Sequence, residues 1–131
     1  MHCTDSSFLI DYLNPRTSEH EAAVAYLDEH RQRPFFAPTF VLYELYRYAA
    51  SRGGREEVQA LAADLDWIEP VPMTESAARE AAIIEAELAE NGEPINRGDI
   101  VIAGIVRDVG GRLVTRDADF EKVPGLLIER Y

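Results

Sequence analysis

Residues 95–120 read Ile-Asn-Arg-Gly-Asp-Ile-Val-Ile-Ala-Gly-Ile-Val-Arg-Asp-Val-Gly-Gly-Arg-Leu-Val-Thr-Arg-Asp-Ala-Asp-Phe, and this stretch decides the fold. Every residue from Ile100 to Val106 is apolar or glycine, so a helix here has no face left for water, which is typical of a buried helix. Gly110-Gly111 ends the helix, and Leu113–Thr115 has the pattern of a short buried strand. The stretch therefore predicts a helix, a turn and a strand, followed by acidic residues.

Shorter apolar segments elsewhere alternate with segments of helical periodicity. The expected strands are Met1–Thr4, Phe35–Ala37, Trp67–Ile68 and Leu126–Ile128, in addition to Leu113–Thr115. The expected helices are Phe8–Leu13, Ser18–Glu29, Thr39–Arg52, Arg55–Ala63 and Thr74–Leu88, in addition to the buried one. This alternation predicts an α/β fold with helices around a central parallel sheet and ligand sites at the carboxyl ends of its strands. A length of 131 residues without a repeat or linker predicts a single domain over 1–131.

Several helix ends and inner faces are also readable. Ser18 and Glu21 have the spacing of a capping box, and Thr39 and Thr74 are each expected to cap a helix. The inner face expected for the helix at Thr39 is Val41, Leu45, Tyr48 and Ala49, before Arg52-Gly53-Gly54 ends it. The buried stripe expected for the helix at Thr74 is Ala77, Ala81, Ile84 and Leu88, before a stop at Asn91-Gly92.

The chain is strongly acidic. Thirteen Lys and Arg against 24 Asp and Glu give a net charge of −11, and Lys122 is the only lysine. Such a surface suits a protein kept soluble in concentrated salt, where repulsion is screened, and it favours a salt-loving host. It argues against a broad nucleic-acid footprint, which is normally basic. Contact with nucleic acid is therefore expected to be local, through metal ions and arginines.

The compartment follows from cysteine usage and from the N-terminal residues. Cys3 is the only cysteine, which excludes an internal disulfide and fits a reducing cytoplasm. The N-terminus lacks the basic segment and apolar run of a signal peptide, and no apolar run approaches a membrane span. We expect a soluble cytoplasmic protein without a membrane partner.

Three carboxylates stand next to expected strands or apolar helix faces. Asp5 ends the first strand, where it also suits a helix cap. Glu44 borders an apolar helix face, although Arg47 three residues on offers it a simple ion pair. Asp99 stands at the entrance of the buried helix, where the helix dipole favours a carboxylate and where capping alone would also explain it.

Asp117 and Asp119 follow the strand at Leu113–Thr115, in a turn where Asp is common for its own hydrogen bonds. Together with Asp5 and Asp99 they predict one site, because the ends of the first and fourth strands can converge on one crevice. Clustered carboxylates repel unless they are protonated or a cation lies between them. Hard oxygen ligands suit Mg²⁺ or Mn²⁺, and one or two such ions with water are equipped to hydrolyse a phosphodiester.

Other sites are absent or ambiguous. Arg97 and Arg116 flank the acids, where they would either hold a substrate phosphate or simply form surface ion pairs. No glycine-rich nucleotide loop is present, and Ser6 and Ser7 have no nearby histidine to activate a nucleophile. The three histidines are His2, His20 and His30; they lack zinc-ligand spacing, and the latter two are expected on a solvated helix.

The order and spacing of these motifs resemble a PIN domain, and most closely the VapC-type toxin ribonucleases of type II toxin–antitoxin pairs. That family has an Asp after the first strand, a Glu in the third helix, an Asp opening a buried helix, and Thr-x-Asp-x-Asp-Phe after the fourth strand. The matching residues, which span essentially the whole chain, are Asp5, Glu44, Asp99 and Thr115-Arg116-Asp117-Ala118-Asp119-Phe120, followed by Val123-Pro124-Gly125-Leu126. Asp5-Ser6-Ser7 departs from the Asp-Thr-Asn of the family: Ser6 keeps a hydroxyl, but Ser7 replaces an amide.

The resemblance implies a three-layer α/β/α fold and an endoribonuclease, dependent on Mg²⁺ or Mn²⁺, that arrests translation by cutting structured RNA such as tRNA or rRNA. Asp5 and Asp99 would be the principal metal ligands. Glu44 and Asp117 would complete the catalytic, metal-binding pocket. The outer and supporting members would be Asp119, Thr115 and Ser6.

The resemblance also implies partners. A homodimer is expected, for which the candidate exposed aromatic contacts are Tyr12, Tyr43 and Tyr46. A small VapB-like antitoxin would cover the pocket, and its DNA-binding half would repress the operon. The toxin itself would then meet DNA only indirectly.

Three other interpretations remain open. A phosphoacceptor receiver module would need paired acids at the first strand and a late lysine, whereas the chain has one acid there and Lys122 lies outside any clear strand end. A catalytically silent PIN-like binding or scaffold module would retain the same residues. A PIN nuclease of RNA processing, or one acting on flapped DNA, would use the same metal chemistry, and only substrate tests separate it from a toxin.

Overall fold

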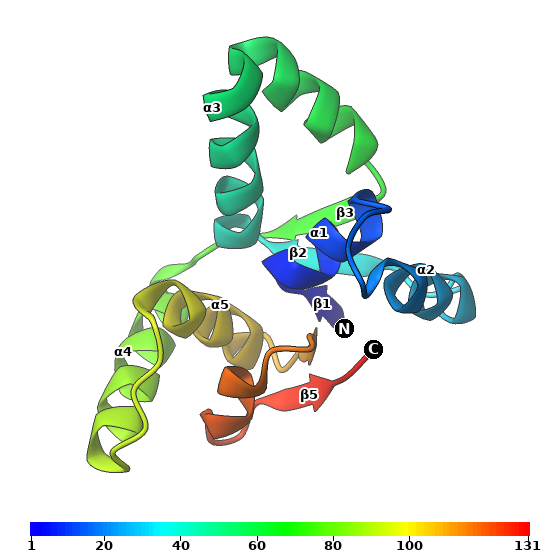
Figure 1. The fold of residues 1–131 in the computed structure, drawn as a ribbon. Helices are drawn as coiled ribbons and strands as arrows, with labels where there is room; N and C mark the ends of the chain where they lie inside the picture. The colour runs from blue at the N-terminus through cyan, green and yellow to red at the C-terminus, as the bar shows by residue number, and fades with distance from the viewer.

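The computed structural model describes all of residues 1–131, which form one five-stranded sheet with helices on both faces (Figure 1). The strands are β1 (His2–Thr4), β2 (Phe35–Pro38), β3 (Ile68–Val71), β4 (Arg112–Val114) and β5 (Leu127–Glu129). All neighbouring pairs are parallel, and the order is β3-β2-β1-β4-β5. The predicted α/β fold with a central parallel sheet in three α/β/α layers is therefore confirmed.

Five helices surround the sheet, and four of them pack in two pairs. The helices are α1 (Ser6–Leu13), α2 (His20–Glu29), α3 (Thr39–Asp64), α4 (Glu75–Glu90) and α5 (Arg97–Asp108), with a 3-10 turn η1 (Ala118–Lys122). α1 packs against α2, and α4 packs against α5 at the other side of the sheet (Figure 1). On β1 the His2 ring contacts Tyr26 of α2, whereas Cys3 lies against Gly111 beyond α5. Neighbouring side chains of a strand point to opposite faces, so the two pairs cover opposite faces.

The buried helix predicted from Ile100 to Val106 is α5, and only Val101 of that run is half-exposed. Its partner α4 buries Ala77, Ala81, Ile84 and Leu88, as predicted, and Thr74 caps it by accepting a hydrogen bond from the Ala77 N–H. The two helices lie very close together. A Cβ placed on Gly104 would lie 2.7 Å from the Ala81 Cβ, so the glycine is required by the contact.

α3 projects away from the sheet as a bent arm (Figure 1). Gly53 and Gly54 have non-helical dihedral angles, so the predicted break is present as a kink inside one long element. Val41, Leu45 and Ala49 are buried as expected, but the inward position predicted for Tyr48 is wrong, since this side chain is 63% exposed. Tyr48 lies at the edge of the buried face, where it lines a groove between α1 and α3 and its hydroxyl accepts a hydrogen bond from Arg52.

Some predicted helix and strand ends are wrong. The capping box at Ser18 is not formed. α2 begins at His20, so the N-cap residue is Glu19, and its side chain makes no capping hydrogen bond. Thr39 is the first residue of α3 and also makes no cap. β3 begins at Ile68 and includes Pro70, which an edge strand tolerates because its missing N–H faces away from the ladder.

The solvated positions predicted for His20 and His30 are also wrong. Both residues are half-buried: His20 Nδ1 lies 2.7 Å from the Asp11 carbonyl oxygen, and His30 Nδ1 lies 2.8 Å from that of Tyr26. The first contact ties the start of α2 to α1, and the second caps the last turn of α2 from within. No helix of the structure combines the length and apolarity that crossing a membrane would require.

Candidate metal and active site

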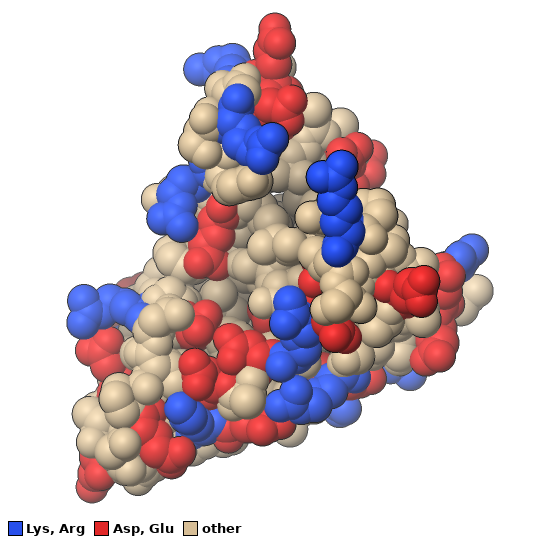
Figure 2. All heavy atoms as spheres, viewed as in Figure 1, with Lys and Arg blue, Asp and Glu red and all other residues tan.

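The acidic residues converge at the carboxyl edge of the sheet, where the chain order reverses between β1 and β4. Open parallel sheets bind ligands at such a point. Asp5 directly follows β1, and Asp117 follows β4 by three residues. The first turns of α3 and α5 supply Glu44 and Asp99. On the face shown in Figure 2, acidic side chains gather in a hollow between α3 and α5.

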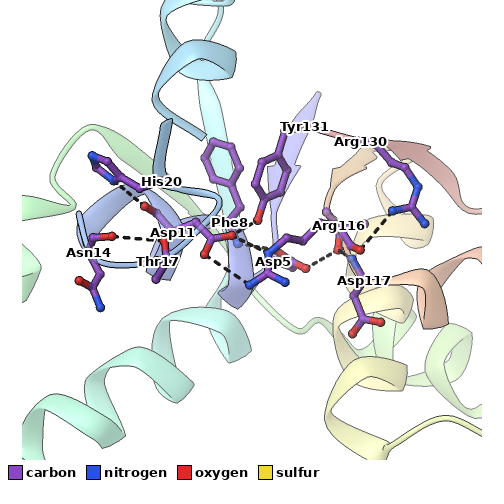
Figure 3. Close-up of polar contacts among 11 residues, drawn as sticks. Asp5, Phe8, Asp11, Asn14, Thr17, His20, Arg116, Asp117, Arg130 and Tyr131 are labelled. Carbon is purple, nitrogen blue, oxygen red and sulfur yellow. Dashed lines mark hydrogen bonds and ion pairs between the residues drawn. The ribbon is translucent and has the colours of Figure 1, made fainter. Parts of the chain in front are cut away.

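Asp5 is the most buried of these acids, at 2% exposed. Its Oδ1 accepts a hydrogen bond from the Phe8 N–H at 2.8 Å, so it caps α1 (Figure 3), and its Oδ2 accepts one from the Thr115 hydroxyl at 2.5 Å. Burial raises the pKa of Asp5 to about 6 even though both hydrogen bonds act to lower it. One carboxylate therefore caps the helix and also lies beside the acidic hollow, so the cap does not exclude a part in the site.

Thr115 connects the acids that follow the two strands. Its hydroxyl donates to Asp5 and accepts the Asp117 N–H at 3.0 Å. Asp117 Oδ1 in turn accepts the Asp119 N–H at 2.9 Å. This chain of hydrogen bonds fixes the turn after β4 against the start of α1.

Asp99 is held by a neighbour that sequence reasoning missed. The N-cap of α5 is Asn96, not Asp99: Asn96 Oδ1 accepts the Asp99 N–H, and Asn96 Nδ2 donates to Asp99 Oδ2, both at 3.0 Å. An Asn three residues before an acid has the spacing of a capping box and was the available signal. Burial first, then the charges of Asp117, Glu44 and Asp119, raise the pKa of Asp99 to about 6.

Glu44 faces the hollow from α3. Its Oε1 accepts a hydrogen bond from the Ser6 hydroxyl at 2.6 Å, which links α3 to the start of α1. A Cβ on Gly98 would lie 3.6 Å from Glu44 Oε2, so the first turn of α5 lies against this carboxylate. The ion pair offered by Arg47 is not formed, because that guanidinium lies over the Tyr43 ring, 5.7 Å from its centroid.

The charge of the hollow is largely uncompensated. Carboxylate oxygens of Asp99, Asp117 and Asp119 lie within 4.8 Å of one another. Asp119 pairs with Lys122 at 3.0 Å, but Asp5, Glu44, Asp99 and Asp117 have no basic partner. A donor set made only of carboxylate oxygens fits a hard divalent cation such as Mg²⁺ or Mn²⁺.

The two flanking arginines form ion pairs, the simpler of the two alternatives offered by the sequence. Arg97 is highly exposed and lies 3.3 Å from Glu85. Arg116 Nε lies 2.7 Å from Oδ2 of Asp11, a fully buried carboxylate that also accepts the Tyr131 hydroxyl at 2.6 Å (Figure 3). Sequence reasoning missed Asp11, because nothing local in α1 indicates a partner more than a hundred residues away.

The comparisons agree with this architecture. Residues 3–126 match the family described as PIN domain, so the chain belongs to the PIN domain family. A search of curated protein sequences found no significant match.

Similar solved structures include VapBC2 of Rickettsia felis bound to a promoter DNA fragment, with TM-score 0.83, 19% identity and coverage of 99% of this chain and 98% of that one. DNA-bound VapBC of Salmonella typhimurium has TM-score 0.83, 24% identity and coverage of 98% and 96%. VapC20 of Mycobacterium tuberculosis, described as a sarcin-ricin loop cleaving toxin, has TM-score 0.69, 19% identity and coverage of 92% and 93%. At these identities the likeness establishes a shared fold.

Proposed function

We propose that this protein is an endoribonuclease dependent on Mg²⁺, with Mn²⁺ as a substitute, and that it acts as the toxin of a toxin–antitoxin pair on structured RNA such as tRNA or rRNA. The observation that carries the proposal is the set of unpaired carboxylates at the carboxyl edge of the sheet, two of which have a pKa raised to about 6. Membership of the PIN family supports a nuclease. The RNA-cleaving description of one structural neighbour supports RNA as the substrate class.

The chain's own residues have distinct parts in this proposal. Asp5 and Asp99 are the principal cation ligands, with Glu44 and Asp117 completing the pocket and Asp119 outside it. A divalent cation held there would lower the pKa of the attacking water and stabilise the leaving oxygen. Thr115 and Ser6 position the acids: the Thr115 hydroxyl donates a hydrogen bond to Asp5, and the Ser6 hydroxyl donates one to Glu44.

The two arginines differ in what they can do for a substrate. Arg97 is highly exposed, and a surface pair such as Arg97–Glu85 is worth only about 0–1 kcal/mol, so it remains available to a phosphate. Arg116 is held by buried Asp11. We therefore propose a phosphate contact for Arg97 and a positioning part for Arg116, beside the turn that carries Asp117.

A cognate VapB-like antitoxin and a second copy of the chain are the proposed protein partners. The neighbours solved as toxin–antitoxin complexes support the antitoxin, with DNA contacted only indirectly through it. A groove of about 380 Å³ runs from Glu44 between α1 and α3, lined by exposed Ile10, Arg47 and Tyr48, and offers a seat for an antitoxin segment. Of the tyrosines expected at a homodimer contact, Tyr43 is widely exposed, whereas Tyr12 and Tyr46 are half-buried. Analytical ultracentrifugation of wild type and of Tyr43→Asp tests the dimer: wild type is expected to sediment as a dimer and the variant as a monomer.

Cleavage of total cellular RNA tests the nuclease. Purified protein with Mg²⁺ or Mn²⁺, in low and in molar salt, is expected to give discrete fragments that disappear with EDTA. Asp99→Asn is expected to lower the rate at least about 100-fold, because the cation supplies several kcal/mol of transition-state stabilisation. Asp66→Asn, the same change at an exposed site before β3, is the matched control. Intact RNA under all conditions with folded wild-type protein would contradict the proposal and favour a silent binding module.

A further inference from the structure

A second group of metal-binding side chains lies outside the acidic hollow and shares no residue with it. His2 on β1, His30 at the end of α2 and Glu129 on β5 come together on the face of the sheet that α2 covers. The Nε2 atoms of His2 and His30 lie 3.5 Å and 3.7 Å from the two carboxylate oxygens of Glu129. One ligand atom from each of the three residues lies within 4.8 Å of the others.

The protonation of His30 is set by its backbone contact. Its Nδ1 lies 2.8 Å from the Tyr26 carbonyl oxygen, which can only accept, so Nδ1 carries the proton. In the neutral ring Nε2 then presents a lone pair toward the lone pairs of Glu129. This orientation, with Nδ1–H on a backbone carbonyl and Nε2 directed at a shared centre, is the one that metal-ligating histidines adopt.

Tyr26 is the buried neighbour of this cluster. Its side chain is more than nine-tenths buried and stacks on the His30 ring at 4.1 Å, and its hydroxyl makes no hydrogen bond of good geometry. This hydroxyl lies close to Glu129, so a group bound by the cluster would be within its reach.

One basic side chain competes with a metal ion for Glu129. Arg112 lies 3.5 Å from Glu129, but it is half-exposed, and surface pairs of this kind are weak and readily rearranged. Two imidazoles and one carboxylate form a borderline-soft donor set that suits Zn²⁺, unlike the all-oxygen hollow.

We propose that His2, His30 and Glu129 bind a single Zn²⁺ ion that ties β1, α2 and the edge strand β5 together. The Tyr26 hydroxyl, which is close to Glu129, would then have a metal-bound water within reach. The ion is structural, because it joins three elements distant in sequence and stands apart from the candidate active site. The sequence did not indicate this site, since residues 2, 30 and 129 have no local spacing that a motif could capture.

Calorimetric titration of untagged protein with Zn²⁺, in excess Mg²⁺ to saturate the hollow, tests the proposal. Wild type is expected to bind one equivalent and to unfold at a higher temperature with Zn²⁺. His30→Gln and Glu129→Gln are each expected to weaken binding at least about tenfold, given that even indirect contacts to metal ligands change affinity by this much. His20→Gln is the matched control, because His20 is the only other histidine and lies at the opposite end of α2.

Nuclear magnetic resonance of the imidazole groups gives an answer even if a variant fails to fold. Added Zn²⁺ is expected to shift the ring signals of two histidines, His2 and His30, and to leave those of His20 unchanged. Absence of Zn²⁺ binding by wild type would overturn the proposal. The proposal would also be overturned if His30→Gln bound Zn²⁺ as tightly as wild type, or if Asp99→Asn were the only variant that lost Zn²⁺ binding.

Discussion

Asp5 and Asp99 differ from the other buried acid of the protein in how their charge is met. Asp11 has Arg116 and Tyr131, and their hydrogen bonds lower its pKa against the effect of burial. Asp5 and Asp99 have no cation, and burial raises the pKa of each to about 6. The structural acid is neutralised within the chain, whereas Asp5 and Asp99 have hydrogen-bond partners but no cation beside them. Perturbed carboxylates of this kind are typical of functional sites.

The raised pKa of Asp99 fixes the sign of its effect on stability. The folded value is about 6 and the ordinary value is 3.8, so between them the folded state binds more protons than the unfolded state. Stability from this group therefore falls as pH rises through about 6. In EDTA near pH 7.5, Asp99→Asn is expected to exceed wild type in free energy of unfolding by about 1–2 kcal/mol, after allowance for solvent screening. Urea unfolding at a series of pH values measures this difference, and the extra stability of Asp99→Asn is expected to vanish near pH 4. If Asp99→Asn were less stable than wild type near pH 7.5, the claim that the charge of Asp99 is uncompensated in the folded protein would be wrong.

Thr115 is expected to matter through its hydroxyl rather than its volume. Thr115→Val leaves Asp5 Oδ2 and the Asp117 N–H without partners in a buried place, which destabilises by about 1–3 kcal/mol. Thr115→Ser keeps both hydrogen bonds and is expected to retain most of the stability and of the RNA cleavage. The unfolding temperature and the rate of RNA cleavage, each measured for both variants, test this prediction. Equal stability and equal RNA cleavage in the Val and Ser variants would show that the Thr115 hydroxyl does not position Asp5 and Asp117.

The convergence of Asp5, Asp99 and Asp117 was predictable from the sequence, because each stands near a strand end or helix start that composition marks, whereas Glu44 lies inside α3 and was indicated by the family resemblance. The supports of these acids were not predictable. Asn96, Asp11 and the Ser6–Glu44 hydrogen bond depend on how separate elements meet, and no local pattern records that. The parts assigned to Arg97 and Arg116 stay predictions, since proximity in sequence to an acid does not fix where a long side chain points.

Among the elements, helix patterns were most reliable where the helix packs along its whole length. The buried stripe of α4 matches its prediction because α5 covers it from end to end. The pattern of α3 failed at Tyr48, which lies at the edge of a buried face that still includes Ala49, on a helix whose outer part projects away from the sheet (Figure 1). Periodicity indicates a face that can be buried, and the tertiary fold decides how much of that face is covered.

The α4–α5 contact gives a prediction at this scale. Gly104→Ala would place a Cβ 2.8 Å from the Ala81 backbone nitrogen and Cα, neither of which can rotate away. Overpacking of this kind destabilises by about 1–3 kcal/mol. A lower unfolding temperature is expected, with only partial rescue by adding Ala81→Gly, because the backbone atoms remain. An unchanged unfolding temperature in Gly104→Ala would show that the two helices are not in contact here.

For the whole molecule, the net charge of −11 predicts a strong dependence on salt. Repulsion among surface acids destabilises the compact state and is screened over about 10 Å at 0.1 M and 3 Å at 1 M salt. The unfolding temperature is therefore expected to rise between about 0.1 M and about 1 M KCl. Calorimetry checks this, and RNA cleavage assayed in parallel tests for a salt-adapted enzyme. An unfolding temperature that is constant or falls with salt would remove the basis for the salt-loving host.

The claim on which the rest depends is that acids from β1, α3, α5 and the turn after β4 form one cation site. Electron paramagnetic resonance of Mn²⁺ tests it without any choice of RNA, because only free Mn²⁺ gives the sharp signal. Wild type near pH 7.5 is expected to remove that signal, Asp99→Asn to bind at least about tenfold more weakly, and Asp66→Asn and His30→Gln to bind as wild type. Failure of wild type to bind Mn²⁺, or unchanged binding in Asp99→Asn, would contradict the site.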